Sequence, residues 1–335
     1  MGRGVPGRKI SPCTMVLRRG VQWSMMAELS HVSEVPRTMS PEQMDGNENP
    51  RILVVGGNGN MGRRFVSAFR DRGCTVQCLD LLDDEGRPVP PAQRAEAVRD
   101  ADIVMLAVPM GVVVSVAEAL GPDLRPDALF CDINSLKEDV CAAMARSPAA
   151  EVLGLHPMFG PTVSDFDGQT LIVCPVRVGP RGRWLRRQLA ELGLVEHESS
   201  PEAHDRMMAV VQVLVHFRTL VMGETLRRSG IGIADSLNYT SPIYRLELAF
   251  VGRLYVQDPG LYAEIEMQNP YGPEVRRAFV ETCTDLKNML DEGDRTSFRT
   301  MFSRVREYFG DFGTEAHATS DAIIDHLVTT RKSDG

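Results

Sequence analysis

The sequence predicts an α/β fold in which a doubly wound parallel sheet is followed by an all-helical C-terminal domain. Two observations carry this prediction. Between residues 50 and 199, short apolar runs alternate with segments of helical periodicity, which is typical of βαβ units. Beyond Ser200, apolar residues recur only at helical spacing, so the second half is expected to contain helices alone.

The first apolar run, residues 52–55, leads into the motif Gly57-x-Gly59-x-x-Gly62, and a helix is expected from 63 to 72. This order of strand, glycines and helix is typical of a Rossmann-type dinucleotide site. We expect Gly57 to make the tight turn, Gly59 to let backbone N–H groups approach a pyrophosphate, and Gly62 to let helix pack on strand. The helix N-terminus supplies partial positive charge for the phosphates.

A second predicted strand, 75–79, ends in Asp80, which lies 18 residues beyond Gly62. A carboxylate at this position accepts hydrogen bonds from the adenosine ribose hydroxyls and repels a 2′-phosphate. The sequence therefore predicts NAD, not NADP, as the cofactor. Further predicted cofactor contacts lie within the glycine motif and in the loops after later strands: Asn60, Met61, Val108, Pro109 and Asn134.

Strands and helices continue to alternate after a polar, proline-rich link at 83–91. Further strands are expected at 103–107, 128–133, 151–155, 171–174 and 194–197, with helices at 112–120, 136–146 and 181–192. Long helices separated by Gly, Pro and Asn breakers are expected at 202–228, 241–256, 273–290 and 295–309. The predicted domains are a disordered leader at 1–49, a nucleotide-binding domain at 50–199, a helical domain at 200–312 and a C-terminal helix or tail at 313–335.

The composition argues against several classes of partner. A chain of 335 residues has room for about two domains, and a net charge of −8 without a basic stripe argues against nucleic acid. No apolar run approaches the ~20 residues of a membrane span, so no membrane contact is expected. The seven cysteines form no CxxC pair, which favours buried free thiols in the cytoplasm over a disulfide framework or a metal site.

Three candidate residues lie in loops at the carboxyl ends of strands, where ligands of such sheets bind. His156 opens a loop braced by Pro and Gly and is the candidate general base, unless it merely bonds its own loop. Ser135 is a second catalytic candidate, although capping the following helix explains a serine equally well. Lys137 sits at a helix start, where its charge opposes the dipole; this suggests an anion partner, with an exposed ion pair as the alternative.

Two arginines in the helical half are candidates for binding an anionic ligand. Arg245 and Arg253 lie in one predicted helix, about 80° apart around its axis. Gly252 removes a side chain beside Arg253 and leaves room for a carboxylate. Neutralisation by Glu247 and Glu264 is the alternative.

The preceding long helix carries further polar candidates. Gln212 and His216 are four residues apart and therefore share one face of that helix. His204 is nearer its start, where capping together with Asp205 is the simplest role.

These motifs resemble those of the prephenate dehydrogenase family, in the branch that contains the bifunctional chorismate mutase–prephenate dehydrogenases. The matching segments are 54–62, 153–161, 241–248 and 251–259, within a similarity that runs from about residue 50 to 312. No mutase activity is expected, because the residues ahead of the glycine motif do not resemble the long helices of a mutase domain. The resemblance also implies a homodimer formed through the helical domain and no metal.

The resemblance implies a substrate that is a cyclohexadiene with a ring carboxylate, a pyruvyl side chain and a hydroxyl at C4. Hydride leaves C4 for NAD, the C4 heteroatom loses a proton, and carbon dioxide departs as the ring becomes aromatic. By resemblance, His156 accepts the proton, Ser135 supports it through a shared hydrogen bond, and Arg253 holds a carboxylate. The further substrate contacts implied are Arg245, Lys137, His216 and Gln212.

Three residues depart from the pattern of the bifunctional branch: Val215 stands where an arginine is expected, Asn134 where a small residue is expected, and Thr162 where an acid is expected. The chain resembles better the stand-alone relatives of antibiotic pathways, which oxidise 4-amino-4-deoxyprephenate to 4-aminophenylpyruvate. Loss of a cation at position 215 would suit an ammonium-bearing substrate, so the sequence favours the 4-amino acid.

Three alternatives remain beside this prediction. Prephenate itself, oxidised for tyrosine biosynthesis, is the main one. A hydroxyacid or imine reductase is disfavoured, because the helix at 202–228 contains no lysine. A non-catalytic NAD sensor is the distant alternative.

Overall fold

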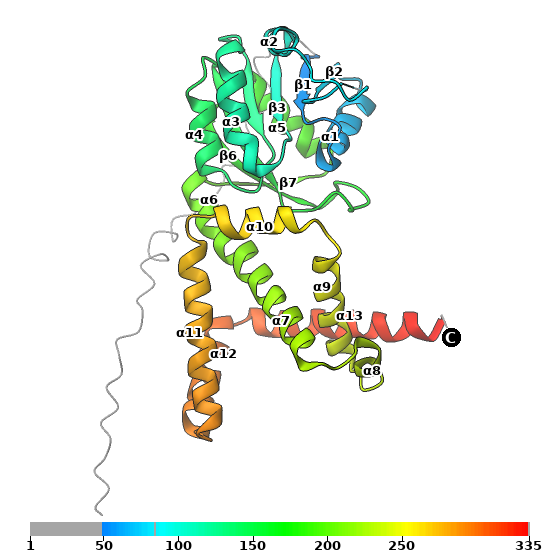
Figure 1. The fold of residues 1–335 in the computed structure, drawn as a ribbon, viewed down its shortest axis with the longest axis vertical. Helices are drawn as coiled ribbons and strands as arrows, with labels where there is room; N and C mark the ends of the chain where they lie inside the picture. Colours follow the sequence, from blue (N-terminus) through cyan, green and yellow to red (C-terminus); the bar gives the residue numbers. More distant parts are fainter. Residues whose placement is uncertain (1–48, 84, 334–335) are drawn as a thin grey trace, which may run out of the picture. The chain divides into compact units, whose positions relative to one another are not determined.

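A computed structural model describes residues 49–83 and 85–333 of the chain (Figure 1). The predicted leader therefore lies outside the described residues, except for Asn49. The described chain begins with a seven-stranded sheet and ends with a series of helices.

The sheet has the strand order β2-β1-β3-β4-β5-β6-β7. Its strands are β1 Ile52–Val55, β2 Val76–Leu79, β3 Ile103–Leu106, β4 Leu129–Asp132, β5 Glu151–Pro157, β6 Thr170–Arg177 and β7 Val195–Glu198. All neighbouring strands run parallel except β5 and β6, which are antiparallel. The sheet is therefore parallel as predicted except at this one pair. A parallel neighbour needs a crossover connection, usually a helix, and residues 158–169 contain no helix.

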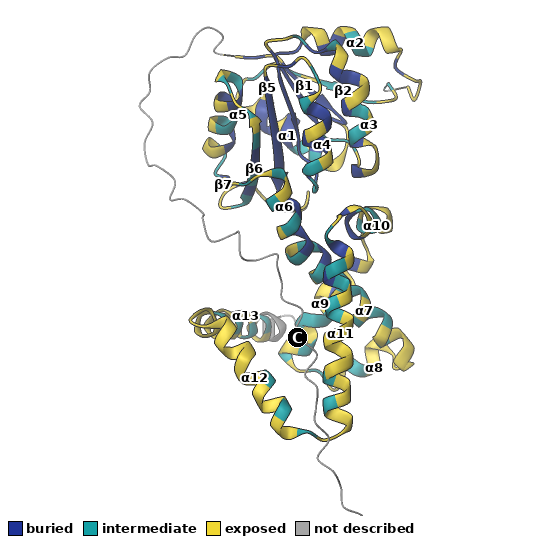
Figure 2. Ribbon diagram, turned by 90° about the vertical axis from the view of Figure 1, so that its left-hand side faces the viewer, coloured by how far each residue is buried: buried dark blue, intermediate teal, exposed yellow. Residues whose placement is uncertain are grey.

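Helices cover both faces of the sheet, as the doubly wound fold class predicts. They are α1 Asn60–Asp71, α2 Pro91–Asp100, α3 Met110–Leu120, α4 Glu138–Ala145 and α5 Pro180–Glu191. Apolar residues of α2, α3 and α4 pack in one buried cluster, and those of α1 and α5 pack in the other. Figure 2 shows the strands between them as mostly buried.

Helix α2 is the element of the sheet domain that the sequence pattern did not predict. It spans ten residues, and only Ala97 and Val98 in it are buried. So small a buried face gives no helical periodicity that can be recognised in the sequence.

Helices alone make up the second half of the described chain. They are α6 Pro201–Met208, a π-helical segment η2 Ala209–Leu214, α7 Val215–Ser229, α8 Ile233–Leu237, α9 Pro242–Tyr255, α10 Pro259–Gln268, α11 Gly272–Asp291, α12 Arg295–Phe309 and α13 Phe312–Ser333. The predicted long helices are present, and α12 has the predicted bounds. The short helix α8 was not predicted, because none of its residues is buried. Helix α10 was also missed; its two buried residues, Ile265 and Glu266, are neighbours and form no periodic stripe.

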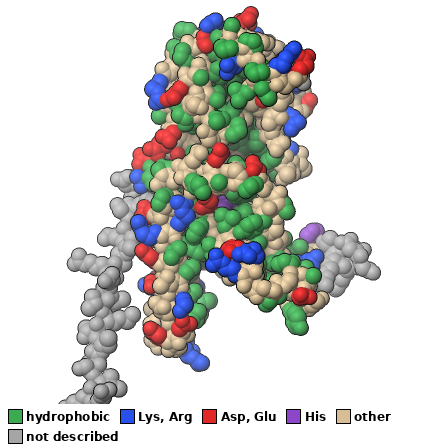
Figure 3. Space-filling view, viewed as in Figure 1, with side chains coloured by type: hydrophobic (Ala, Val, Ile, Leu, Met, Phe, Trp, Pro, Cys, Tyr) green, Lys and Arg blue, Asp and Glu red, His purple; other side chains and the backbone are tan. Residues whose placement is uncertain are grey.

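Several of these helices leave large apolar side chains exposed. Helix α12 has no buried residue, and α11 buries only Gly272 and Val275 at its start. Phe302 of α12 and Val280 of α11 are each 53% exposed. Figure 2 shows both helices as mainly exposed, and in Figure 3 hydrophobic side chains reach the surface among charged ones. An uncovered apolar surface of this kind is typical of an interface with another chain.

The continuous helix Pro201–Ser229, made of α6, η2 and α7, spans 29 residues and is long and apolar enough to cross a membrane. Charged residues such as Asp205, Arg206 and Arg218 interrupt it, so it is not one uninterrupted apolar run, and the expected absence of membrane contact stays a prediction. Length and composition alone do not distinguish a membrane span from a helix at a protein interface. This helix carries His204 and Gln212, whose side chains contact His156 of the sheet.

Candidate active site

The chain turns from β1 into α1 at Gly56, whose φ of +84° is a left-handed conformation that favours glycine. A Cβ atom at Gly56 would lie 2.6 Å from the carbonyl oxygen of Ala107. The turn is closed by the N–H of Gly59, which donates to the carbonyl oxygen of Gly56 at 3.0 Å, so Gly57 lies within the turn as predicted. Gly62 has the predicted packing role, because a Cβ atom there would lie 2.2 Å from the carbonyl oxygen of Gly56.

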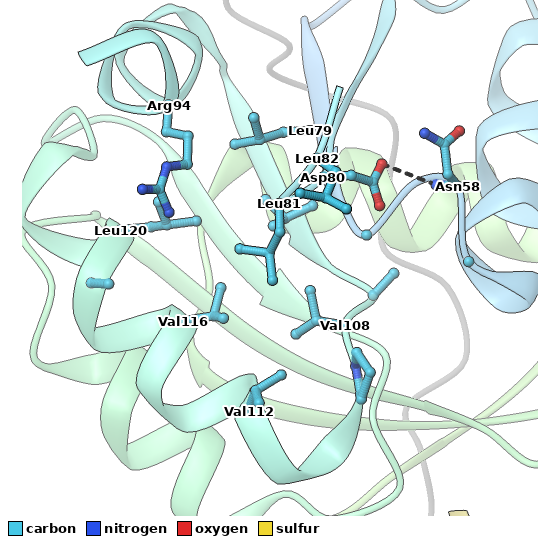
Figure 4. A pocket seen from close by; sticks show the side chains of 16 residues that line it. Asn58, Leu79, Asp80, Leu81, Leu82, Arg94, Val108, Val112, Val116 and Leu120 are labelled. Carbon is cyan, nitrogen blue, oxygen red and sulfur yellow. Dashed lines mark hydrogen bonds between the residues drawn. The ribbon is translucent and has the colours of Figure 1, made fainter. Parts of the chain in front are cut away.

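The carboxylate of Asp80 faces this turn from the end of β2 (Figure 4). Its Oδ2 accepts a hydrogen bond from the backbone N–H of Asn58 at 3.3 Å. A cavity of about 420 Å³ opens beside it, between β1, β2 and α3. Its walls are mainly apolar, with Arg94 of α2 also on its edge; Leu79, Leu81, Leu82, Val108, Val112, Val116 and Leu120 line it. An apolar slot beside a carboxylate fits the adenosine half of a dinucleotide.

Four of the predicted cofactor contacts line this cavity: Gly59, Asp80, Val108 and Pro109. The others do not line it: Gly57, Asn60, Met61, Gly62 and Asn134. The Asn60 side chain accepts a hydrogen bond from Arg63 at 3.4 Å. Met61 packs against the core cluster on the α1 side of the sheet. The backbone N–H of Asn134 donates to Asp132 Oδ2 at 2.9 Å. Contacts of these residues with a pyrophosphate or nicotinamide remain predictions.

His156 is the penultimate residue of β5, not the first residue of the loop, and it is only 3% exposed. Its Nδ1 lies 2.8 Å from Nε2 of His204, and its Nε2 lies 3.3 Å from Nε2 of Gln212. Burial, with His204 and Lys137 nearby, holds the pKa of His156 well below its ordinary value of about 6.5. The imidazole is therefore neutral at pH 7, as a general base requires.

The long helix carries the polar side chains that contact His156. It begins at α6, where Ser200 caps it by accepting from the N–H of Ala203 at 3.1 Å. Gln212 lies in the π-helical segment η2, a widened form of helix that often marks a functional position. His204 and Gln212 then reach the two nitrogens of one ring from positions about two turns apart on the same helix.

Ser135 does not have its predicted partner. Among the described residues it has no hydrogen bond to His156, because the ring nitrogens of His156 lie against His204 and Gln212. Nor does Ser135 cap α4, which begins at Glu138. The backbone N–H groups of Lys137 and Glu138 donate instead to the Asp205 carboxylate, at 2.8 and 2.9 Å. The predicted hydrogen bond from Ser135 to His156 and the predicted cap of α4 by Ser135 are therefore both absent from this arrangement of the described residues.

Lys137 is fully buried, which contradicts a role in binding substrate. Its ammonium donates to Oδ2 of Asp132 and, at 2.8 Å, to the carbonyl oxygen of Leu155. The side chains of Lys137 and Asp132 are both 0% exposed. The anion that pairs with this lysine is therefore Asp132 from the end of β4, and its ammonium is closed off from a ligand.

The two predicted anion-binding arginines keep their charge available. Arg253 reaches the loop that follows β5, where its Nη2 donates to Thr162 Oγ1 at 3.4 Å. Glu247 pairs with Arg218 at 3.6 Å and so neutralises neither Arg245 nor Arg253. Within residues 49–83 and 85–333, no carboxylate lies at ion-pair distance from either predicted arginine.

Two buried polar atoms next to these residues have no hydrogen-bond partner: Oε1 of Gln212 and Nδ1 of His216. Unpaired buried polar atoms are rare in proteins and often mark a place where a ligand or water binds. The His216 ring lies edge-on to Tyr262, with 5.0 Å between the ring centroids. Burial raises the pKa of Tyr262, and the nearby charge of Arg253 opposes this rise. His216, Tyr262 and Arg253 therefore form one cluster.

Sequence reasoning missed three residues of this region. The adjacent His204-Asp205 pair was a visible signal, but capping a helix explained it more simply. Nothing in the sequence distinguishes Tyr262, because its contact with His216 joins two separate helices.

Two family models match the chain. Residues 89–186 match the prephenate dehydrogenase nucleotide-binding domain, and residues 200–304 match the prephenate dehydrogenase dimerization domain. The T-protein of Enterobacter agglomerans is 35% identical over 273 residues, which cover 82% of this chain and 71% of that protein. The 4-amino-4-deoxyprephenate dehydrogenase of Streptomyces pristinaespiralis is 29% identical over 278 residues, covering 79% of this chain and 93% of that protein.

A solved structure shows the same fold. The prephenate dehydrogenase of Aquifex aeolicus, in complex with hydroxyphenyl propionate and NAD+, superimposes with a TM-score of 0.63 at 20% identity. The match covers 80% of this chain and 98% of that one. Together with the nucleotide-binding family model, these findings confirm the predicted fold class.

Proposed function

The chain belongs to the prephenate dehydrogenase family, and we propose that it oxidises a prephenate-type cyclohexadiene acid with NAD and releases its ring carboxylate as carbon dioxide. The observation that carries this proposal is the buried, neutral His156 at the carboxyl end of β5, a position where ligands of parallel sheets bind. Arg253 supports it by offering an unneutralised guanidinium beside the loop that follows His156.

Each residue has a distinct part in the proposed reaction. The glycine turn and Asp80 would hold NAD, which would supply the acceptor for a hydride from C4 of the substrate. His156 takes the proton from the C4 heteroatom through its Nε2, a step that is typically worth ~10²–10⁴ in rate. Arg253 binds a substrate carboxylate, and the positive charge of Arg245 adds to the electrostatic attraction of the anionic substrate. Gln212 and His216 line the substrate pocket through their unpaired polar atoms.

We propose 4-amino-4-deoxyprephenate as the substrate, with prephenate as the second candidate. Val215 supports the amino acid, because an uncharged residue beside His216 does not repel an ammonium group at C4. The family models, which are named for prephenate dehydrogenase, favour the second candidate. Sequence identity does not favour the amino substrate, since it is 35% to the T-protein and only 29% to the 4-amino-4-deoxyprephenate dehydrogenase.

The purified protein and NAD, given each acid in turn, test the reaction and its substrate through NADH formation. We expect a higher kcat/KM for the 4-amino acid. We expect Val215→Arg to reduce that preference by up to about fivefold, because an exposed charge pair is worth only ~1 kcal/mol. Val215→Met is the matched neutral control and should leave the preference unchanged. A large preference of the unaltered protein for prephenate would refute the amino assignment, and no NADH with either acid would refute the reaction.

Replacing Asp80 with serine should let the protein use NADP. The change removes a carboxylate that repels the 2′-phosphate, and we expect the ratio of kcat/KM for NADP to that for NAD to rise about tenfold or more. Asp83→Asn is the control, because Asp83 is a nearby acid of the same link that pairs with Arg87 instead. An unchanged ratio in Asp80→Ser would show that Asp80 does not select the cofactor.

We also propose a cytoplasmic homodimer formed through the helical domain. Support comes from the match to the family's dimerization domain at 200–304 and from the exposed apolar side chains of α11 and α12. In this arrangement a second subunit covers the apolar surface of the helix Pro201–Ser229. Sedimentation of the full chain as a stable, active monomer would refute the dimer.

A further inference from the structure

We propose that His204 and Asp205 are positioning residues, which hold His156 in the tautomer with a free Nε2 and take up the positive charge when His156 accepts a proton. The three side chains form one hydrogen-bonded row, with 2.8 Å between the two histidines and 2.6 Å from His204 Nδ1 to Asp205 Oδ1. The part concerning charge rests on the proposed function. The part concerning the tautomer does not depend on any substrate.

Asp205 determines which atoms donate and which accept along this row of hydrogen bonds. Its carboxylate accepts from the backbone N–H groups of Lys137 and Glu138, which can only donate. These two bonds anchor Asp205, which is 1% exposed, against the start of α4. One of its oxygens is thereby presented as an acceptor to His204, so Nδ1 of His204 carries the proton.

The proton on Nδ1 of His204 determines where the ring proton of His156 lies. A neutral His204 with its proton on Nδ1 has only a lone pair on Nε2. Because Nδ1 of His156 lies 2.8 Å from that lone pair, His156 must donate there, and its own Nε2 is left unprotonated. Nε2 of Gln212, at 3.3 Å, is a donor that matches this free lone pair. A base that takes a proton through Nε2 needs this tautomer.

The same row can move charge away from the reacting ring. When the bond from the substrate heteroatom to its proton breaks, an N–H bond forms at Nε2 of His156. The Nδ1 proton of His156 can then pass to Nε2 of His204, which places the positive charge beside the Asp205 carboxylate. The other charged pair near His156 is closed, because the ammonium of Lys137 faces Asp132. Asp205 is therefore the carboxylate that contacts this row among the described residues.

Asp205→Asn tests the proposed role of the row His156–His204–Asp205. An amide can donate to His204 and so reverse the direction of the hydrogen bonds along the row. His204 then keeps its proton on Nε2 and donates to His156, whose own proton moves to Nε2 and blocks the base. In the substrate-free protein with ¹⁵N-labelled histidine, we expect NMR to show His156 protonated at Nδ1 in the unaltered chain and at Nε2 in the variant. We expect kcat to fall by about 10²–10⁴ with little change in KM.

Two further variants separate tautomer, charge and structure. His204→Gln retains an oxygen that accepts from His156, so the tautomer should persist while kcat falls because the second proton transfer is lost. Ser200→Ala weakens the cap of the same helix without touching the row, so it should change neither the tautomer nor kcat. His156→Asn assigns the His156 signals.

The proposed role of His204 and Asp205 is overturned if the unaltered protein carries its His156 proton on Nε2, or if folded Asp205→Asn retains the original tautomer of His156. It is also overturned if Ser200→Ala reverses the tautomer as Asp205→Asn does, since the effect would then be structural. The tautomer of the unaltered chain decides the matter even if Asp205→Asn does not fold. If no acid yields NADH, the proposed function fails while the NMR result still stands.

Discussion

Replacing His156 with asparagine is expected to lower kcat by about 10²–10⁴ while leaving the affinity for NAD unchanged. Asparagine is polar and fits the site, but it cannot accept a proton from the C4 heteroatom at neutral pH. His156 lies on β5, away from the cavity beside Asp80, so the adenosine contacts are not altered. The measurements are the rate of NADH formation under saturating substrate and the Kd of NAD by calorimetry.

His197→Asn is the matched control, because His197 is an exposed histidine on β7 and has no part in the proposed reaction. It should retain full activity. A fall of less than about tenfold in His156→Asn would contradict general-base catalysis by this residue. A protein that only senses NAD would show no catalytic loss at all.

The pH dependence follows from the same residue. Burial, with His204 and Lys137 nearby, lowers the pKa of His156, so the neutral base persists at pH values below about 6.5. The acid-side midpoint in the pH dependence of kcat/KM, which reports on the free enzyme, should therefore lie below about 6.5. Titration of the His156 ¹⁵N signals reads the pKa directly, without interference from an amine on the substrate. A midpoint at or above 6.5 would contradict the environment described here.

Replacing Lys137 with methionine is expected to lower the free energy of unfolding of the sheet domain by about 3–5 kcal/mol. The change removes the ammonium that faces Asp132 and leaves a carboxylate that is 0% exposed. Burial already raises the pKa of Asp132, while the Lys137 charge and the N–H of Asn134 oppose this rise. Without the lysine, the charged form of Asp132 loses its main support. Denaturant unfolding measures the loss.

The double variant Asp132→Asn/Lys137→Met should be less unstable than Lys137→Met alone, because no charge then remains buried. Lys287→Met is the surface control, since Lys287 forms an exposed pair with Asp291, and it should leave stability unchanged. If Lys137→Met raised KM strongly without loss of stability, Lys137 would instead be a substrate-binding residue, as the sequence had suggested.

Much of the sheet domain could be predicted because its signals are local. Each strand is a short apolar run, and Gly62 is required by a contact with the turn only six residues away. The order of strand, glycines, helix and Asp80 lies within 29 residues, so it identified the cofactor site without any tertiary information. The turn at these glycines was predicted, but the left-handed conformation of Gly56 was not, because adjacent glycines look alike in a sequence.

The prediction was weakest where one side chain has several possible partners. Arg253 and His156 were identified by type and by position in their segments, and the structure brings Arg253 to the loop that follows the strand of His156. Ser135 and Lys137 were identified in the same way, yet Lys137 pairs with Asp132 and the cap of α4 comes from Asp205. A residue type restricts the kinds of partner but does not select one.

By itself, the sequence determined the class of fold and the family and predicted NAD as the cofactor, because periodicity, turn chemistry and motif spacing depend on neighbouring residues. Only the tertiary structure decided which side chains of the site contact one another. His156 meets His204 across 48 residues and Gln212 across 56, and Asp205 reaches the N–H of Lys137 across 68. Contacts at such separations depend on how the strands of one domain pack against the first helix of the next. The physical reason is that contacts of 2.8–3.3 Å between such distant residues require positions that only the packed chain provides.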